Sequence, residues 1–587
     1  MLEQIRREKI SPLVWKAFLR ILPVEIIGII VFAINTFVDN IITSHALGME
    51  SVAAIGLFAP VATVIGVTDV VIFGTQILCG RHIGHGEGDK VISLFSTGVV
   101  SLGAFSLIMT VLCLIFRQPL AVLLGAKGEL VGLVADYITG YAPGIIGQVL
   151  VGMLIIYSPF NNDIKRSYFG IGVMIVSNTV LDILFVFVLR IGIIGMGIAT
   201  SCSYLLSWAV MIPGFTSRKK AVHFRWKGLC FGRLPEAIRI GLPSLMVIVG
   251  CTARGHLMNR MLMSNVGTAA VAAMAIQGNV CAIVGSIPMG SSNALQTMGS
   301  IYYGEEDRHS FLDLVRFSLV IGTALSSAVM AILMLFSGGI ASIYFPRTVE
   351  AWEATRRMLM LFPCFLVFNT IFCLLMKAYQ LQNKTILVNI LSVAEPLIMP
   401  VFTVGMIGVL GSDAVWLAFP FSEIVCIAVI AVSVMIHAGK LTMALPDWMK
   451  LGWDFGASAE ECMEFSVRTT EEVLNVSVTI IDFCRHRGID KKRSMLAGLA
   501  VEEMAGNVVE HGFRPGEKHR VDIRLVAKNR LFICVRDDCR AFDPKLRLEQ
   551  FEPEDVTKNI GIRMIAGMAR QMNYQCPAGI NTLQIWL

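Results

Sequence analysis

Charged residues are scarce in this chain of 587 residues: only 16% are Asp, Glu, Lys or Arg, whereas 55% are hydrophobic. Soluble domains carry about 25% charged residues, so a soluble globular protein of this length is excluded. The scarcity is uneven, because charges are sparse and clustered up to about residue 440 and dense from there to Leu587. The composition therefore predicts a membrane-embedded part followed by a water-soluble part.

Other expected signals are also missing. The 14 cysteines include no CxxC pair, and most lie in apolar runs, which indicates small buried hydrophobic side chains rather than disulfides or metal ligands. No basic stripe interleaved with aromatics accompanies the net charge of +6, so nucleic acid is not an expected partner. No small-residue cleavage site follows the first apolar run, which favours a retained membrane span over a signal peptide.

Twelve apolar runs have the roughly 20-residue length that crosses a bilayer. The even number places both termini on one side of the membrane. The runs lie near residues 23–44, 52–78, 94–116, 130–157, 167–189, 191–214, 240–262, 268–296, 312–337, 357–379, 385–407 and 413–437.

Basic residues in the loops indicate the orientation. They gather in the connection between the sixth and seventh runs (218–239), and the N-terminal arm and the loop at 165–166 fall on the same side. Cytoplasmic loops carry the excess of Lys and Arg, so both termini are predicted to be cytoplasmic, in a bacterial inner membrane. Three arginines between 347 and 357 fall on the opposite side and weaken this count without reversing it.

The membrane part repeats itself. Gly86-Glu-Gly-Asp recurs as Gly304-Glu-Glu-Asp, and Ile191-Gly-Ile-Ile-Gly recurs as Ile407-Gly-Val-Leu-Gly, at offsets of about 217 residues. A fixed period predicts two six-helix lobes of parallel orientation, about 15–215 and 233–440, related by an axis along the membrane normal.

Two acidic residues within the first-half spans are candidates for ion coupling. Burying a charge there costs about 2.5–3.5 kcal/mol on insertion scales, so Asp39 and Asp182 are functional candidates by default. Asn35 and Asn178 each stand four residues before one of them, on the same helix face. Such a pocket can hold a proton or Na⁺. The alternative is that each Asp only bonds a neighbouring helix.

The second half has different chemistry. Arg254 in the seventh span and Glu395 in the eleventh are conspicuous buried charges. Buried charges usually pair, so a structural Arg254–Glu395 ion pair is favoured over a role in substrate binding.

Several segments resemble multidrug and toxic compound extrusion (MATE) transporters, in that family's order. They are Asn35-Thr-Phe-Val-Asp39, Ala53-Ala-Ile-Gly-Leu-Phe-Ala-Pro60, Ser177-Asn178-Thr-Val-Leu-Asp182 and Gly241-Leu-Pro243-Ser. The resemblance implies a V-shaped pair of six-helix bundles that exports cationic amphiphiles in exchange for H⁺ or Na⁺. In one branch the coupling ion is carried at positions matching Asp39, Asn178 and Asp182. The other branch uses an acidic residue in span seven, where this chain has Arg254.

The remainder of the chain, 446–587, has a soluble pattern. It predicts an α+β sandwich. The expected elements are strands at 464–468, 521–526, 531–535 and 582–587 and helices at 471–487, 491–511 and 561–572.

Three motifs in this region resemble the ATPase superfamily of gyrase, histidine kinases and anti-sigma-factor serine kinases. The resemblance assigns Glu503 as general base, Asn507 as a Mg²⁺ ligand, Asp537 to the adenine amino group and Gly561 to the phosphate-binding glycine box, with ATP as the ligand. Two departures are Cys539 and Asn559, which stand where those boxes usually have glycine and put close approach of a nucleotide in doubt.

The first hypothesis for function is a cation-coupled antiporter that exports small organic cations from the lipid membrane, with a cytosolic domain that senses ATP or docks a regulatory protein. A lipid-precursor flippase is the second. A membrane-anchored serine kinase that uses the transporter half as its input is the third. Headgroup-binding assays and phosphate transfer to a partner serine discriminate among them.

Overall fold

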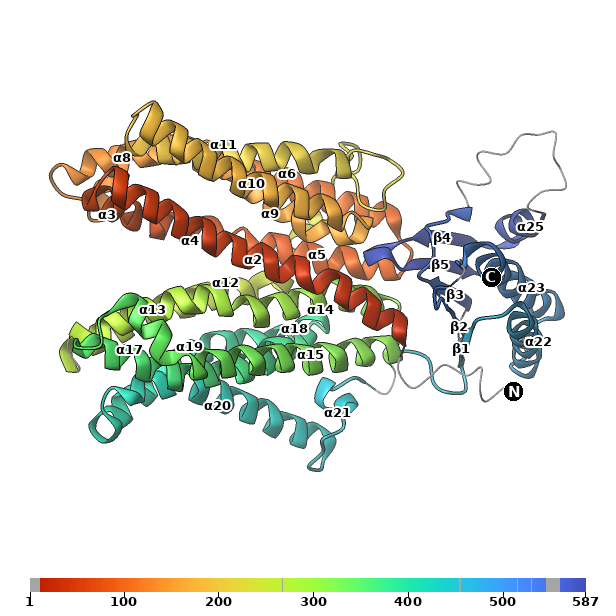
Figure 1. Cartoon of the computed structure of the whole chain (residues 1–587). Helices are drawn as coiled ribbons and strands as arrows, with labels where there is room; N and C mark the ends of the chain where they lie inside the picture. The colour runs from red at the N-terminus through yellow and green to blue at the C-terminus, as the bar shows by residue number, and fades with distance from the viewer. Residues whose placement is uncertain (1–10, 266–267, 453–454, 515, 529, 545–559) are drawn as a thin grey trace.

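The computed structural model describes residues 11–265, 268–452, 455–514, 516–528, 530–544 and 560–587. A long helical bundle carries a smaller α/β domain at one end (Figure 1). Among the described residues, twelve helical segments are long and apolar enough to cross a membrane, which confirms the predicted count.

Lobe 1 is the first half of the bundle. Several of its spans are built from two shorter helices. Its elements are α2 (Pro12–Ala46), α3 (Met49–Leu57), α4 (Ala59–Gly66), α5 (Asp69–Gly84), α6 (Gly88–Ile115), α7 (Arg117–Leu123), α8 (Leu130–Tyr141), α9 (Gly144–Tyr157), η1 (Ser158–Asn161), α10 (Ile164–Ile183), η2 (Leu184–Val188), α11 (Ile193–Met211) and η3 (Ile212–Phe215).

Lobe 2 repeats this order, and a short linker helix, α21 (Leu445–Met449), follows it. Its elements are η4 (Phe231–Arg233), α12 (Leu234–Asn265), α13 (Thr268–Val284), α14 (Ser286–Gly304), α15 (Arg308–Leu335), α16 (Ser337–Tyr344), α17 (Glu350–Leu361), η5 (Phe362–Cys364), α18 (Phe365–Leu381), α19 (Thr385–Leu410) and α20 (Asp413–Ala438).

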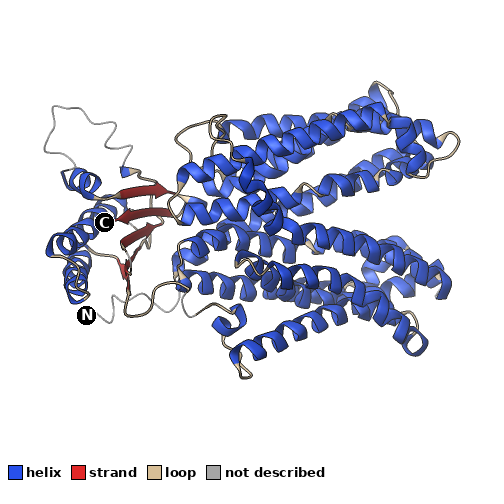
Figure 2. Cartoon of the chain, turned by 180° about the vertical axis from the view of Figure 1, so that it is seen from behind, coloured by secondary structure: helices blue, strands red, loops and turns tan. Residues whose placement is uncertain are grey.

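The two lobes meet at the end of the bundle that carries the α/β domain and diverge toward the other end (Figures 1 and 2). Glycines allow the close approach of α5 and α14. A Cβ on Gly84 would lie 2.3 Å from the carbonyl oxygen of Ile301, and one on Gly304 would lie 2.3 Å from that of Arg81. The helix backbones therefore touch, and this end of the bundle is closed.

The α/β domain has one antiparallel sheet in the order β1-β2-β3-β5-β4. Its helices cover the sheet face that points away from the bundle (Figure 1). The elements are β1 (Cys462–Val467), α22 (Thr470–His486), α23 (Lys491–Asn507), η6 (Val508–Gly512), β2 (Val521–Ala527), β3 (Leu531–Asp537), α25 (Ile560–Met568), β4 (Gln571–Gln575), η7 (Pro577–Gly579) and β5 (Asn581–Trp586).

Most expected elements of this domain are confirmed, but the helix predicted over 561–572 is wrong at its end. The helix stops at Met568, and Gln571–Gln575 forms strand β4. The reason is tertiary, because β4 pairs along its length with β5 and the Arg570 amide already donates to the carbonyl of Trp586. Local helix propensity does not decide the structure there.

The sheet is buried on both faces. On β3, Leu531, Ile533 and Val535 belong to the apolar core under the helices, whereas Arg536 points the other way and bonds the bundle. The period-2 alternation of a strand thus separates an apolar core face from a polar face that lies against the lobes.

Gly304→Val tests the helix crossing. The added side chain would collide with the Arg81 backbone, and overpacking of this kind costs about 1–3 kcal/mol. We expect a lower thermal-unfolding midpoint for the purified protein in detergent. Gly103→Val in α6 is the matched control, because nothing lies within 4 Å of a Cβ there. Equal midpoints for the two variants would contradict the close contact.

Candidate functional site

A buried carboxylate pair lies inside lobe 1, where α10 packs against α2 and α11. The Asn178 amide donates to Oδ1 of Asp39 at 2.7 Å and to Oδ2 of Asp182 at 2.9 Å. The Ser203 hydroxyl donates to Oδ1 of Asn178 at 3.2 Å, which fixes the amide orientation. The structure therefore brings three of the four sequence candidates into one cluster.

The cluster is closed off from solvent on most sides. Asn178 and Asp182 are fully buried, and the two carboxylates lie within hydrogen-bonding reach of each other. Oδ1 of Asp182 and Oδ1 of Asn35 are buried and find no hydrogen-bond partner in the described part of the chain. A buried acceptor oxygen without a hydrogen-bond partner raises the free energy of the folded state. Binding a cation or a proton would remove this cost.

Lobe 2 holds a second acidic cluster that sequence reasoning only half identified. Arg254 donates to the Met399 sulfur at 3.6 Å and lies over the Phe419 ring, and it reaches Glu395 through a longer-range electrostatic interaction. Glu423, fully buried in α20, lies beside Glu395 and accepts from the Asn369 amide at 2.7 Å. Glu423 carries the same sequence signal as Asp182, a lone acid within an apolar span.

A third polar group joins the lobes. Lys377 of α18 donates to Oε1 of Gln296 at 2.6 Å, and Gln296 donates to Oε1 of Gln76 in α5 at 2.5 Å. Nearby, Asn293 donates to Oε2 of Glu25 at 3.3 Å. Lys377 is the lone cation of the apolar helix α18, and that signal was available in the sequence.

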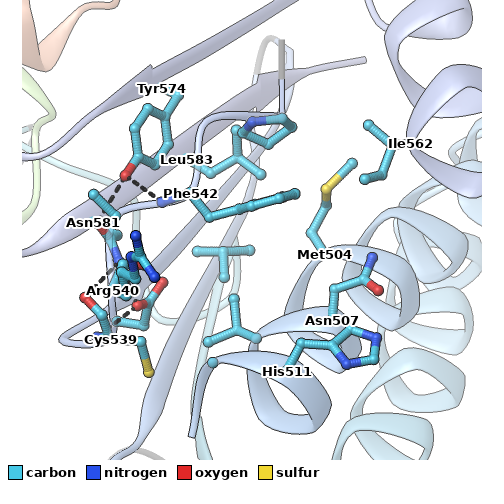
Figure 3. A pocket seen from close by; sticks show the side chains of 16 residues that line it. Met504, Asn507, His511, Cys539, Arg540, Phe542, Ile562, Tyr574, Asn581 and Leu583 are labelled. Atoms are coloured by element: carbon cyan, nitrogen blue, oxygen red, sulfur yellow. Dashed lines mark hydrogen bonds between the residues drawn. The ribbon is translucent and has the colours of Figure 1, made fainter. Parts of the chain in front are cut away.

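The α/β domain contains a cavity of about 590 Å³ between its helices and its sheet (Figure 3). This is within the range of about 300–1,000 Å³ usual for small-molecule sites. Two of the predicted nucleotide residues, Asn507 and Asp537, line it. Other lining residues are Met504, His511, Gly512, Cys539, Phe542, Ile562, Tyr574, Asn581 and Leu583.

Asp537 ends β3 and is buried at the floor of this cavity. Its Oδ1 accepts from the Asn581 amide at 2.6 Å and from the backbone N–H of Cys539 at 2.9 Å. Burial raises the pKa of Asp537, and these two donors oppose the rise. A buried acid held in this way is suited to accept from an exocyclic amino group such as that of adenine.

The ATPase-type motif residues Glu503 and Gly561 lie against each other. A Cβ on Gly561 would be 2.0 Å from Cδ of Glu503, so a larger residue there would have to displace the Glu503 side chain. Asn507 follows Glu503 by about one turn and faces the cavity (Figure 3). Asn559 lies outside the described residues.

Cys539 lines the cavity, and the missing side chain of Gly512 leaves space for it. A Cβ on Gly512 would lie 3.3 Å from Cβ of Cys539. Burial raises the pKa of the Cys539 thiol to about 12, which keeps it neutral. The donors, the buried acid and the cavity volume together fit a nucleotide.

Two six-helix lobes with buried carboxylates, followed by a nucleotide-type α/β domain, define a multi-pass membrane transporter fused to an ATPase-like domain. The profile of the MatE family matches residues 26–188 and 243–405, and that of the histidine kinase-like ATPase domain matches 467–586. The MatE matches together cover more than half of the chain, and the chain belongs to the MatE family.

Known relatives agree with this assignment. The probable multidrug resistance protein YoeA of Bacillus subtilis (strain 168) is 20% identical over 384 residues, which cover 62% of this chain and 81% of YoeA. A MOP superfamily transporter from Pyrococcus furiosus is 23% identical with a TM-score of 0.64, over 70% of this chain and 93% of that one. The D35N mutant of the Vibrio cholerae MATE transporter VcmN is 19% identical with a TM-score of 0.65, over 72% and 95%. At these identities the structures show the fold.

Tyr574→Phe tests whether the hydrogen bonds of the Tyr574 hydroxyl hold the segment after β3 against the cavity. The Tyr574 hydroxyl donates to Oδ1 of Asn581 at 2.7 Å and accepts from the backbone N–H of Phe542 at 3.0 Å. Losing both bonds destabilises the segment after β3 by about 1–3 kcal/mol. We expect faster trypsin cleavage at the exposed Arg540, and Tyr168→Phe, on the partly exposed Tyr168 of α10, is the control. Unchanged cleavage would show that these bonds do not hold the wall.

Proposed function

We propose that this protein is a secondary antiporter that exports small organic cations across the cytoplasmic membrane in exchange for H⁺ or Na⁺. The single observation that carries the proposal is the Asp39–Asn178–Asp182 cluster. The name of the relative YoeA, a probable multidrug resistance protein, supports organic compounds as the exported class.

The cluster has the chemistry that coupling requires. One amide serves two carboxylates that lie within reach of each other, and two like charges this close cannot both stay ionised without a cation between them. Gaining or losing a proton or Na⁺ therefore changes how tightly α2 and α10 are held together. Asn35, one turn before Asp39, offers a further oxygen from the same face of α2.

Ion gradients supply enough energy for this exchange. One charge that moves down 100 mV releases about 2.3 kcal/mol. At about 1.4 kcal/mol per tenfold, that sustains a substrate gradient of roughly fifty-fold. Transport itself then needs no ATP.

The ATPase-like domain is proposed to bind a nucleotide and to regulate the transporter. Asp537 would accept from the adenine amino group, and Asn507 would hold Mg²⁺. The start of α25 at Gly561 would face the phosphates. When bound, ATP would supply a transferable phosphoryl group. Glu503 is the candidate general base, because it lies on the same face of α23 as Asn507.

The α/β domain end of the bundle is assigned to the cytoplasm by the basic loops around 165–166 and 218–239. Both termini then lie on that side, and the lobes diverge toward the outside. The surrounding partner is lipid, and a cytosolic regulatory protein is a further partner that the exposed surface of the α/β domain can accommodate.

Asp39→Asn and Asp182→Asn test the coupling site. Each change removes an ionisable group and leaves the shape, so we expect ethidium efflux to fall by about tenfold or more, a loss of roughly 1.4 kcal/mol or more in coupling. Efflux is measured in cells with matched membrane expression. Asp136→Asn, at an exposed position in α8, is the control and should retain transport. Wild-type efflux in either core variant would refute the coupling role.

Asp537→Asn tests the nucleotide site. ATP with Mg²⁺ at about 100 times its Kd stabilises the state that binds it by about 2.7 kcal/mol. We therefore expect ATP to raise the unfolding temperature of the intact wild-type chain, and we expect this rise to be largely lost in the variant. Asp482→Asn, on the exposed face of α22, should respond like the wild type. No shift in the wild-type chain would make the domain a docking module without a nucleotide.

A further inference from the structure

The polar face of the sheet grips lobe 2 through charged groups. Arg536 of β3 donates to Oδ2 of Asp307 at 2.8 Å and pairs with the Glu305 carboxylate. Arg524 of β2 donates to the backbone carbonyls of Glu305 at 3.2 Å and Glu306 at 2.9 Å. These acceptors lie in the loop between α14 and α15. Both arginines are buried by this docking.

The other half of the same sheet face grips lobe 1 through neutral groups. Gln584 of β5 donates to the carbonyl of Gly84 at 2.9 Å, and Gln575 of β4 donates to that of Ile83 at 2.9 Å. Gln571 donates to the carbonyl of Gly86 at 2.8 Å. The acceptors lie at the end of α5, in the loop whose repeat copy is the loop that Arg536 holds.

Two contacts from α2 and one from the loop before α10 add to the contacts between the domain and lobe 1. Lys16 of α2 forms an ion pair with Asp538, and Arg20 donates to the carbonyl of Gly579 at 2.7 Å. Asn162 donates to the sulfur of Cys576 at 3.5 Å. Strands β1 to β3 therefore hold mainly lobe 2, whereas β5, β4 and their flanking loops hold mainly lobe 1. Two bonds cross this division: Gln584 also donates to Oε1 of Glu305 at 2.9 Å, and the Ser11 hydroxyl, just before α2, donates to Oδ2 of Asp522 in β2 at 2.7 Å.

The linker before the α/β domain, from α21 to Phe455, contacts lobe 2. Arg308 donates to the carbonyl of Gly452 at 2.9 Å, and Tyr379 donates to that of Trp448 at 2.6 Å. The Phe455 ring stacks on Tyr303 with centroids 4.7 Å apart. All of these partners belong to lobe 2, to which the linker is also covalently continuous. If the domain separated from lobe 2, the arginine bonds, the ring stack and the linker hydrogen bonds would all break at once.

We propose that the ATPase-like domain is a clamp across the cytoplasmic ends of the two lobes, that it stays on lobe 2, and that it must release lobe 1 before the cytoplasmic side can open. The proposal rests on the proposed transport function, because a transporter that alternates its access must separate these ends. Opening between α5 and α14 cannot occur while one sheet bonds both loops.

The nucleotide cavity adjoins one of the contacts with lobe 1 through neighbouring residues of the chain. Asp537 at its floor is followed by Asp538, which binds Lys16 of lobe 1 and accepts from Nδ1 of His519 at 3.0 Å. Burial favours a higher pKa for Asp538, but Lys16 and His519 outweigh it and hold the pKa below its usual value, so the group stays ionised. A nucleotide at Asp537 would therefore sit one residue from a contact that must open.

Two reversible tethers test the clamp. Asn162→Cys places a thiol beside Cys576 and allows lobe 1 to be fixed to the domain with a short, reducible thiol cross-linker. His309→Cys with Glu464→Cys fixes lobe 2 in the same way, where the native side chains lie 3.2 Å apart. The purified full chain is reconstituted in vesicles, and ethidium counterflow is measured before cross-linking, after it and after reduction. Peptide mapping confirms each cross-link.

We expect the lobe 1 tether to lower counterflow by about tenfold or more, with recovery on reduction, and the lobe 2 tether to change it by less than about twofold. Full activity with the lobe 1 tether closed would overturn the proposal. Equal arrest by both tethers would overturn the assignment of release to lobe 1. Activity of each variant before cross-linking shows that it is folded.

A readout without transport separates the clamp from the proposed function. Ser300→Cys places a thiol at the α5–α14 crossing, where Ser300 is fully buried beside Gly80. We expect a water-soluble maleimide to label it above the parent background, and the closed lobe 1 tether to slow labelling severalfold. ATP should change the labelling rate of the untethered protein. Tether-sensitive labelling without ethidium transport would reject the antiporter and retain the clamp, whereas tether-insensitive labelling would reject the clamp.

Discussion

The structure depends on one constraint: a polar or charged group inside the bundle must find its partners within the protein, because hydrocarbon offers none. This constraint explains why Asp39 and Asp182 share the Asn178 amide, and why Lys377 bonds Gln296 between the lobes. Each cluster is therefore a place where a change of charge alters helix contacts. The same constraint makes such residues candidates for coupling.

The constraint also acts where the sheet meets the lobes. In the sequence, alternate polar residues of β2 and β5 are typical of a strand face exposed to water, yet Arg524 and Gln584 are buried in the assembled chain. Their partners are carbonyls and carboxylates at helix ends, which have no intrahelical donors of their own. At these helix ends the bundle supplies acceptors and the strands supply donors, whereas Lys16 and Arg20 of α2 donate in the opposite direction. Docking satisfies both sets at once.

The sequence predicted the parts of the structure that depend on local pattern. Span length and the 217-residue period gave the twelve helices and two lobes, and i, i+4 spacing put Asn178 beside Asp182. Contacts between distant segments were not predictable in this way. Strand β4 forms because β5 pairs with it, and Cys539 fits because Gly512 leaves space. Glu423 carried a usable signal but was missed, because its partner Asn369 lies on another helix.

The asymmetry of the clamp has an energetic consequence. The repeat-related loops are gripped differently, by three amide-to-carbonyl bonds on lobe 1 and by two buried arginines on lobe 2. At about 0.5–1.5 kcal/mol per neutral hydrogen bond, the three bonds sum to a few kcal/mol. A ligand at about 100 times its Kd contributes about 2.7 kcal/mol, which is the same size. A nucleotide that binds only the state in which lobe 1 is released could therefore offset these three bonds. The Lys16 and Arg20 contacts with lobe 1, and the arginine contacts on lobe 2, would require more.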